Sequence, residues 1–185
     1  TGFILSNTIG RNAHRVSGQV IKEIVQGYMD NIASLKKYGV QIEMAGGETA
    51  DVGDLVQTVI VDSTLTVRMK RSDVIDCRNI KPGDVIVGIS STGKASYEKT
   101  ENSGIGSNGL TAARHEVLAH YYADKYPEAY SPTIPKENVF RGKYRLEDRL
   151  NDKLTVGEAL LSPTRTYAPI LQKLFETVTR DKIHG

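Results

Sequence analysis

The sequence has little of three things that mark particular classes of protein: cysteine, net charge and long apolar runs. Its single cysteine, Cys77, excludes an internal disulfide framework and a zinc site built from cysteines, and fits a reducing compartment. Lysine and arginine total 24 against 22 acidic residues, so a net charge of +2 offers no single-sign field for general binding to nucleic acid or membranes. No apolar run approaches the roughly 20 residues of a membrane helix, and no signal peptide opens the chain. We therefore expect a cytoplasmic protein without a nucleic-acid or membrane partner.

What is present is an ordinary globular composition, with 39% hydrophobic and 25% charged residues in a chain of 185. That length allows one large domain or two small ones. The turn Lys81-Pro82-Gly83-Asp84 separates a strand-rich part from a β-loop-α part, which predicts a boundary near residue 82. The chain begins without Met on a strand-like run and stops on Gly185, so we expect both ends to be cut.

Before this boundary, three segments have clear periods. Residues 18–38 carry apolar side chains at helical spacing, with Ser17 placed to cap the start and Gly39 to end the helix. Residues 40–44 read as a short strand. Residues 59–69 alternate strictly, which predicts a long, half-buried strand of an antiparallel sheet.

After the boundary, the apolar run at 85–89 predicts a strand buried on both faces. A loop rich in glycine, serine and threonine follows at 90–108, and then a helix at 110–121. Residues 124–153 show no period and are expected to be an irregular excursion. A last helix, from Tyr167 to Val178, carries one apolar stripe.

The first candidate for chemistry is Gly46-Gly47-Glu48-Thr49-Ala50-Asp51, with Asp54 close behind. Paired glycines after a strand predict a sharp turn whose backbone can approach a ligand closely. The three carboxylates could share a hard cation such as Mg²⁺, which prefers oxygen ligands. A tight turn with solvated acids explains the same residues, and the spacing does not separate the two interpretations.

The second candidate is the glycine-rich part of the loop, which runs from Ser90 to Gly109 between a predicted strand and a predicted helix. Backbone N–H groups and a helix N-terminus bind anions at such a place. The loop has neither the Gly-Lys-Ser/Thr of a P-loop nor the glycine spacing of a dinucleotide fingerprint. A flexible surface loop in which Asn108-Gly109 only turns the chain is the alternative.

The third candidate is Leu161-Ser162-Pro163-Thr164-Arg165-Thr166-Tyr167. Pro163 favours an extended entry, and Thr164 is placed to cap the helix that follows. Arg165 would then project from the first helical turn, where the helix dipole slightly disfavours a cation, so we expect it to bind phosphate or carboxylate. An ordinary surface arginine is the alternative.

Taken in order, these motifs resemble the phosphoribosylformylglycinamidine cyclo-ligase family, also called the aminoimidazole ribonucleotide synthetases. The resemblance covers residues 3–185 and rests on an ordered set of elements. They are Gly46-Gly47-Glu48-Thr49-Ala50, the alternating strand, Gly83-Asp84-Val85-Ile86-Val87-Gly88, Ser107-Asn108-Gly109-Leu110 and Leu161-Ser162-Pro163-Thr164-Arg165-Thr166-Tyr167.

The resemblance implies a two-domain fold of the mixed α+β and α/β kind, as in the aminoimidazole ribonucleotide synthetase-like superfamily. Residues 1–82 would be the end of an N-terminal domain that binds ATP and forms a homodimer through a sheet that includes 59–69. Its strand-rich portion would combine an antiparallel or mixed sheet with a helix. Residues 83–185 would be the start of a C-terminal α/β domain.

The reaction implied is ATP-dependent ring closure of formylglycinamidine ribonucleotide to aminoimidazole ribonucleotide in purine biosynthesis, with ADP and phosphate released. Such a site mainly orients groups and neutralises phosphoryl charge. The implied ATP and phosphate residues are Gly46, Gly47, Glu48 and Thr49. The implied Mg²⁺ ligands are Glu48 and Asp51. The implied substrate residues are Ser107, Asn108, Gly109, Thr164 and Arg165.

Several departures accompany the resemblance. A lysine-containing nucleotide segment upstream and a Gly-Gly-Gly turn downstream are not in this chain, which alone is therefore expected to be inactive. Gly106 stands where relatives often have histidine, and residues 92–105 and 124–153 are longer than the usual family loops. Two alternatives stay open: a catalytically inactive homologue that serves as an assembly subunit, and an ATP-dependent small-molecule kinase of the same superfamily.

Overall fold

The computed structural model describes residues 2–162 and 164–185. The chain divides into two compact units. Unit 1 combines the residues up to Val87 with Tyr167–Gly185, and unit 2 is Gly88–Thr166. Helices and a small mixed sheet are both present, so the mixed α/β class predicted from the sequence is confirmed. How these units correspond to the two expected domains stays a prediction.

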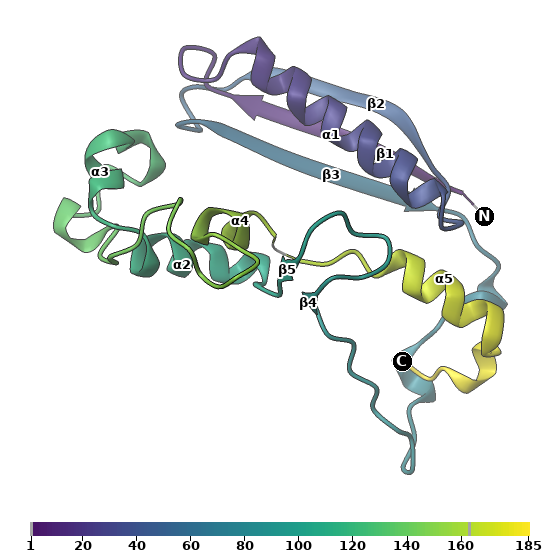
Figure 1. The fold of residues 1–185 in the computed structure, drawn as a ribbon. Coiled ribbons are helices and arrows are strands. Elements are labelled where there is room, and N and C mark those ends of the chain that lie inside the picture. Colours follow the sequence, from purple (N-terminus) through teal and green to yellow (C-terminus); the bar gives the residue numbers. More distant parts are fainter. Residues whose placement is uncertain (1, 163) are drawn as a thin grey trace. The chain divides into compact units, whose positions relative to one another are not determined.

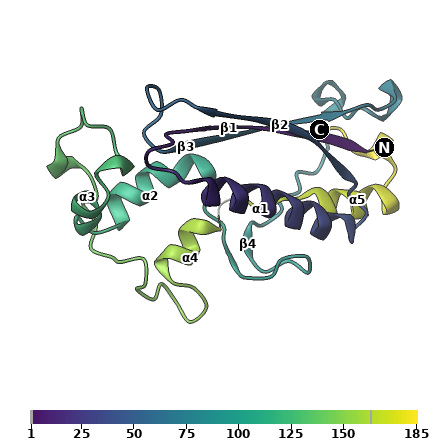
Figure 2. The same ribbon diagram turned by 90° about the horizontal axis from the view of Figure 1, so that it is seen from above.

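Unit 1 is built on a three-stranded sheet with the strand order β2-β1-β3. The strands are β1 (Phe3–Arg11), β2 (Ile42–Asp51) and β3 (Val59–Val67). β1 pairs parallel with β2 and antiparallel with β3. Helix α1 (Gly18–Lys36) connects β1 to β2 and runs along one face of the sheet (Figures 1 and 2). The predicted helix and the predicted alternating strand therefore both form.

Of the two residues predicted to end α1, Gly39 acts as expected, whereas Ser17 makes no capping hydrogen bond. Ser17 precedes the helix with extended backbone, but its side chain makes no capping hydrogen bond. At the other end Gly39 has a φ of 82°, a conformation that favours glycine. The Gly39 N–H donates to the Lys36 carbonyl (3.2 Å), and the Val40 N–H donates to the Leu35 carbonyl (3.2 Å). These two bonds form a Schellman motif, with Leu35 and Val40 both buried beside it.

The sheet has a covered and an uncovered face. Leu5 and Ile9 of β1 are buried on the α1 side, and the antiparallel register places Leu65 and Val61 of β3 beside them. Yet Leu65 remains 51% exposed, so the prediction of a half-buried strand is wrong for this element. β3 is an edge strand, and one helix about 10 Å wide covers only about two strands spaced about 4.8 Å apart.

The predicted buried strand at 85–89 is also wrong. Ile86 is 98% exposed, and its neighbours Val85 and Val87 are nearly as open. In the described part of the chain this run belongs to neither sheet, so it has no neighbouring strand to form a hydrogen-bonded ladder with. The predicted last helix forms as α5 (Ala168–Thr177), which belongs to unit 1 and places Gln172 against Gly39.

Unit 2 consists of short elements held together by irregular chain. They are β4 (Thr92–Gly93), β5 (Asn102–Ser103), α2 (Leu110–Val117), α3 (Tyr121–Lys125) and α4 (Val156–Leu161). β4 and β5 form an antiparallel pair. The helix predicted to reach residue 121 ends at Val117, because Leu118 and Ala119 turn extended and bridge to the segment at 142–144.

The long segment at 124–153 is irregular, as predicted, but it also supplies the core of unit 2. Val139 and Phe140 are almost fully buried there, against Tyr122 of α3 and Val156 of α4. Helix α4, which the sequence patterns did not predict, begins with a capping box in which Thr155 and Glu158 bond each other's backbone N–H. None of the helices in the described residues combines the length and apolar character needed to cross a bilayer.

Candidate functional site

The Gly-Gly-Glu-Thr-Ala motif lies inside β2, so the predicted turn is wrong. β1 offers a parallel partner along this whole stretch, and pairing continues as far as Arg11 and Asp51. The glycines instead accommodate a register shift: Leu5 pairs with Met44, but the next residue of β1 pairs with Gly46. Gly46 has a φ of 106°, which a residue with a side chain rarely adopts.

Gly47 is needed for a different reason. A Cβ at this position would lie 1.9 Å from the backbone oxygen of Asn7 and 2.5 Å from its side-chain oxygen. The close backbone approach that paired glycines permit is therefore made here to the neighbouring strand. The Asn7 side chain is itself buried, and its amide nitrogen has no hydrogen-bond partner among the described residues.

The three acidic residues of the motif are not brought to one point. Side chains of a strand alternate, so Glu48 and Asp51, three positions apart after the bulge, lie on opposite faces of β2. Glu48 faces away from α1, whereas an Asp51 carboxylate oxygen accepts from the Ala13 N–H (3.1 Å). Asp54 follows the strand. No group of three or more metal-ligating side chains gathers in the described parts of the chain, so a shared Mg²⁺ site of Glu48 and Asp51 does not fit this arrangement.

A different acid shares the face of Glu48. Thr8 of β1 pairs with Glu48 on one side and with Asp62 of β3 on the other, which lines up the three side chains across the uncovered face. Both carboxylates are exposed. Sequence spacing could not find this pair, because it depends on the register of two strands on either side of β1.

The second candidate element, Ser107-Asn108-Gly109, forms a turn of 3₁₀ helix that leads directly into α2. The Gly109 N–H donates to the Gly106 carbonyl (2.9 Å), and the N-cap positions of the 3₁₀ turn and of α2 are glycines, Gly106 and Gly109, without a side-chain capping bond. The element therefore lies at a helix N-terminus, as predicted. Its Asn108 side chain lies close enough to Gly106 that a Cβ there would meet it at 2.9 Å.

Arg165 differs in position from the prediction. α5 begins at Ala168, preceded by Tyr167, so Thr164 does not cap it and Arg165 does not project from its first turn. Pro169 in the first turn explains this delayed start, because proline is favoured there. The prediction for Pro163 falls outside the described residues.

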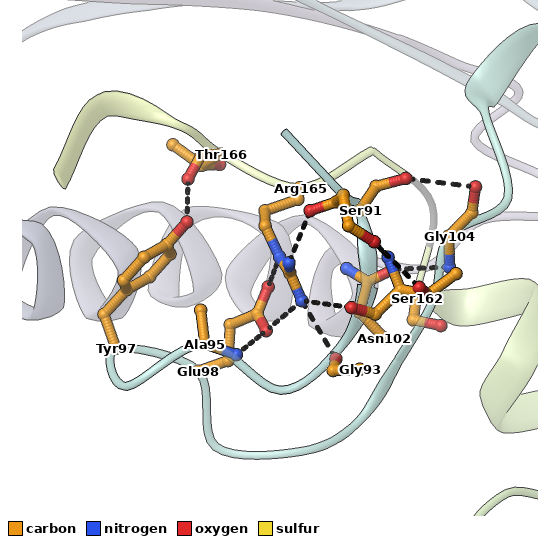
Figure 3. A network of polar contacts seen from close by, with 12 residues as sticks. Ser91, Gly93, Ala95, Tyr97, Glu98, Asn102, Gly104, Ser162, Arg165 and Thr166 are labelled. Carbon is orange, nitrogen blue, oxygen red and sulfur yellow. Dashed lines mark hydrogen bonds and ion pairs between the residues drawn. The ribbon is translucent and has the colours of Figure 1, made fainter. Parts of the chain in front are cut away.

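Arg165 is instead the centre of a buried polar network in unit 2 (Figure 3). The residue is only 7% exposed. Its Nε and Nη2 donate to the two carboxylate oxygens of Glu98 at 2.7 and 2.9 Å, a two-point ion pair. Nη1 donates to the Ser90 carbonyl (2.8 Å) and Nη2 also to the Gly93 carbonyl (2.9 Å).

Glu98 was not among the predicted residues, and no local pattern singles it out. Burial by itself would raise the pKa of this carboxyl group, but the hydrogen bonds from Arg165 and from the Ala95 N–H outweigh burial and lower the pKa. Glu98 is therefore charged at neutral pH. The signal for Arg165 was its predicted place in the first turn of a helix, where the helix dipole disfavours a cation, whereas its acidic partner lies 67 residues earlier.

A second set of bonds joins the same loop to the end of α4. The Ser103 N–H donates to the Ser162 Oγ (2.9 Å), and the Ser103 hydroxyl donates to the Ala159 carbonyl (2.7 Å). The Gly104 N–H donates to the Asn102 Oδ1 (2.8 Å). Loop 90–104 is thus fixed at both of its ends to the segment that carries Arg165, and it leads on to Ser107. The two predicted substrate elements of unit 2 are connected through this loop.

Several curated proteins similar to this chain share one name. A phosphoribosylformylglycinamidine cyclo-ligase of Methanocaldococcus jannaschii is 31% identical over 134 residues, which is 72% of this chain and 29% of that protein. The proteins of the same name from Pyrococcus furiosus and Methanococcus maripaludis strain C6 are 30% and 26% identical over 90% and 91% of this chain. No profile of a known protein family matches it.

The chain is a relative of these cyclo-ligases. The resemblance read from the ordered motifs is therefore confirmed, since the matches extend over 72–91% of the chain. The chain spans only 29–38% of the length of these three cyclo-ligases.

Proposed function

We propose that the protein closes a ring in purine biosynthesis, as an ATP-dependent phosphoribosylformylglycinamidine cyclo-ligase of the cytoplasm. The observation that carries this proposal is sequence similarity over most of the chain to three proteins of that name. ATP would phosphorylate the amide oxygen of formylglycinamidine ribonucleotide, the amidine nitrogen would attack the activated carbon, and phosphate would leave. The resemblance also implies the superfamily fold and its two domains.

The proposed roles follow the two units. In unit 1, Gly46, Gly47, Glu48 and Thr49 would serve ATP, with Glu48 on the face that α1 leaves uncovered. Mg²⁺ accompanying ATP could be held by Glu48 together with ligands other than Asp51, which lies on the opposite face. In unit 2, substrate would bind to the two elements that loop 90–104 connects. These are Ser107, Asn108 and Gly109, and Thr164 with Arg165, whose buried guanidinium would serve the substrate by holding the loop rather than by contacting the ligand.

The proposal is tested by replacing Glu48 with alanine in the full-length protein. Glu48 is exposed, so Glu48→Ala should leave the thermal unfolding temperature unchanged. A lost charge-assisted contact should raise the KM for ATP by about tenfold or more. Glu43→Ala is the matched control, because Glu43 is an exposed acid on the same strand and face, before the bulge.

ADP release and ring closure should be measured together with formylglycinamidine ribonucleotide and Mg²⁺. Absence of both from the wild-type protein would refute the cyclo-ligase proposal and favour an inactive assembly subunit. ADP release with a phosphorylated, uncyclised product would instead favour the small-molecule kinase. Unchanged ATP kinetics in Glu48→Ala would remove Glu48 from the nucleotide site.

A homodimer formed through β3 belongs to the same proposal. β3 is an edge strand, and Leu65 and Val67 on the α1 side of it are exposed. Edge strands with exposed apolar residues pair readily with other chains. Full-length protein should sediment as a dimer, and Leu65→Lys should shift it toward monomer, whereas sedimentation of the wild type as a monomer would contradict this assembly.

A further inference from the structure

The network around Arg165 differs from an open anion-binding site, because the guanidinium is bonded to groups of the protein itself. All three nitrogens of the Arg165 guanidinium donate, to a carboxylate and to backbone carbonyls of its own unit. Glu98 occupies the fork of the guanidinium in the two-point geometry that a phosphate or carboxylate ligand would use. The guanidinium is therefore engaged within the protein.

The bonds of Arg165 and Glu98 fix loop 90–104. Through Ser90 and Gly93, Arg165 fixes the first part of loop 90–104, and through Glu98 it fixes the middle. Glu98 in turn closes a local turn, because its Oε2 accepts from the Ala95 N–H (2.7 Å) while its own N–H donates to the Ala95 carbonyl (3.0 Å). Removing the carboxylate would release two contacts on the guanidinium and one on the loop.

We propose that Glu98 is a positioning residue, which through Arg165 sets the shape of loop 90–104 and thereby the place of Ser107–Gly109. A buried ion pair contributes little net stability compared with an apolar replacement, but its directional bonds define one geometry. The loop is rich in glycine and serine and would otherwise sample many conformations. The last step, from loop shape to substrate binding, rests on the proposed function, whereas the first does not.

The first test is hydrogen exchange on Glu98→Gln, which keeps the size of the side chain and removes its charge. Exchange of the Ala95 and Glu98 amides should accelerate by about tenfold or more, with a smaller acceleration at Ser103 and Gly104. Glu101→Gln is the matched control: Glu101 lies on the same loop, but its partner is the exposed Lys153. Equal exchange in the two variants, or acceleration confined to Ala95 and Glu98, would overturn the proposal.

The pH dependence of hydrogen exchange in the loop is a second test. A residue that only fills space would not change this dependence. Arg165 contacts Glu98 directly, and the other charged residues of the loop are Lys94, Lys99 and Glu101, of which Glu101 pairs with Lys153 of a later segment. The folded-state pKa of Glu98 is lowered, so protection of the loop should persist below the ordinary pKa of a glutamate and fall as the pH passes the lowered value. In Glu98→Gln, the exchange rate of the loop, corrected for its intrinsic pH dependence, should not show this loss of protection at low pH. If the wild type and Glu98→Gln lost the same amount of protection at low pH, the assignment to Glu98 would be overturned.

Kinetics of the full-length enzyme test the last step. Glu98→Gln should raise the KM for formylglycinamidine ribonucleotide by several-fold while changing kcat and the KM for ATP less, and Glu101→Gln should change none of these. Unaltered KM in Glu98→Gln would refute the link from loop to substrate. An inactive wild-type enzyme would refute the proposed function instead, and the exchange measurements would still decide whether Glu98 positions the loop.

Discussion

The replacement Gly47→Ala tests how the glycine pair of β2 is used. The added methyl group would lie 1.9 Å from the Asn7 backbone oxygen, far inside the 3.4 Å at which ordinary contacts begin. Backbone cannot rotate out of the way as a side chain can, so β1 and β2 must separate. Overpacking of this kind costs about 1–3 kcal/mol, and a lost ladder hydrogen bond adds about 0.5–1.5 kcal/mol. We expect Gly47→Ala to lower the free energy of unfolding by about 3 kcal/mol.

Urea unfolding followed by circular dichroism measures this loss. With a slope of about 2 kcal/mol per molar urea, the midpoint should fall by about 1.5 M. Peptide-resolved hydrogen exchange over Phe3–Arg11 should show that unit 1 is the part that opens. The measurement does not require ATP or substrate.

Two other glycines act as controls. Gly46→Ala meets no atom within 4 Å and is strained only by its φ of 106°, so its cost should stay near 1–2 kcal/mol. Gly27→Ala, inside α1 with open space around it, should stabilise the protein by up to about 1 kcal/mol. If Gly47→Ala unfolded at the wild-type midpoint yet lost ATP use, the glycine would serve a ligand and our reasoning would be refuted.

Two further replacements test other parts of the structure. Thr155→Ala removes the capping box of α4 and should cost about 1 kcal/mol, measured as a shift in the urea midpoint; no shift would mean that the box is not formed in solution. Ile86→Ser should change stability by less than about 0.5 kcal/mol, because Ile86 is 98% exposed, and a loss of 2 kcal/mol or more would show that this run is buried after all.

Periodic segments were the part of the fold that could be predicted from the sequence. α1 and α5 each present an apolar stripe, and β3 alternates, so local spacing was enough to find them. Burial was not predictable in the same way. In the described chain, few elements cover the apolar residues of β3 and the run around Ile86. The spacing of residues within a segment does not show how many other elements will pack against it.

The candidate site shows the same limit. The glycine pair Gly46-Gly47 predicts a turn, but glycine equally permits a bulge and a close strand contact, and only the pairing with β1 separates these uses. Arg165 stands out in the sequence, yet its predicted place in the first turn of the last helix is wrong, and its partner Glu98 is too distant in sequence for any spacing rule. The ordered set of motifs nevertheless identified the relatives.

The division of the chain has a consequence for the order in which it can fold. Unit 2 is a continuous stretch, whereas unit 1 is interrupted by it and is completed only by Tyr167–Gly185. Domains generally fold as units while synthesis proceeds from the N-terminus. The sheet of unit 1 would therefore leave the ribosome before unit 2, and α5 would follow only after all of unit 2 had emerged. During that interval its uncovered strands would be the part of the nascent chain most open to chaperones or to pairing with another copy.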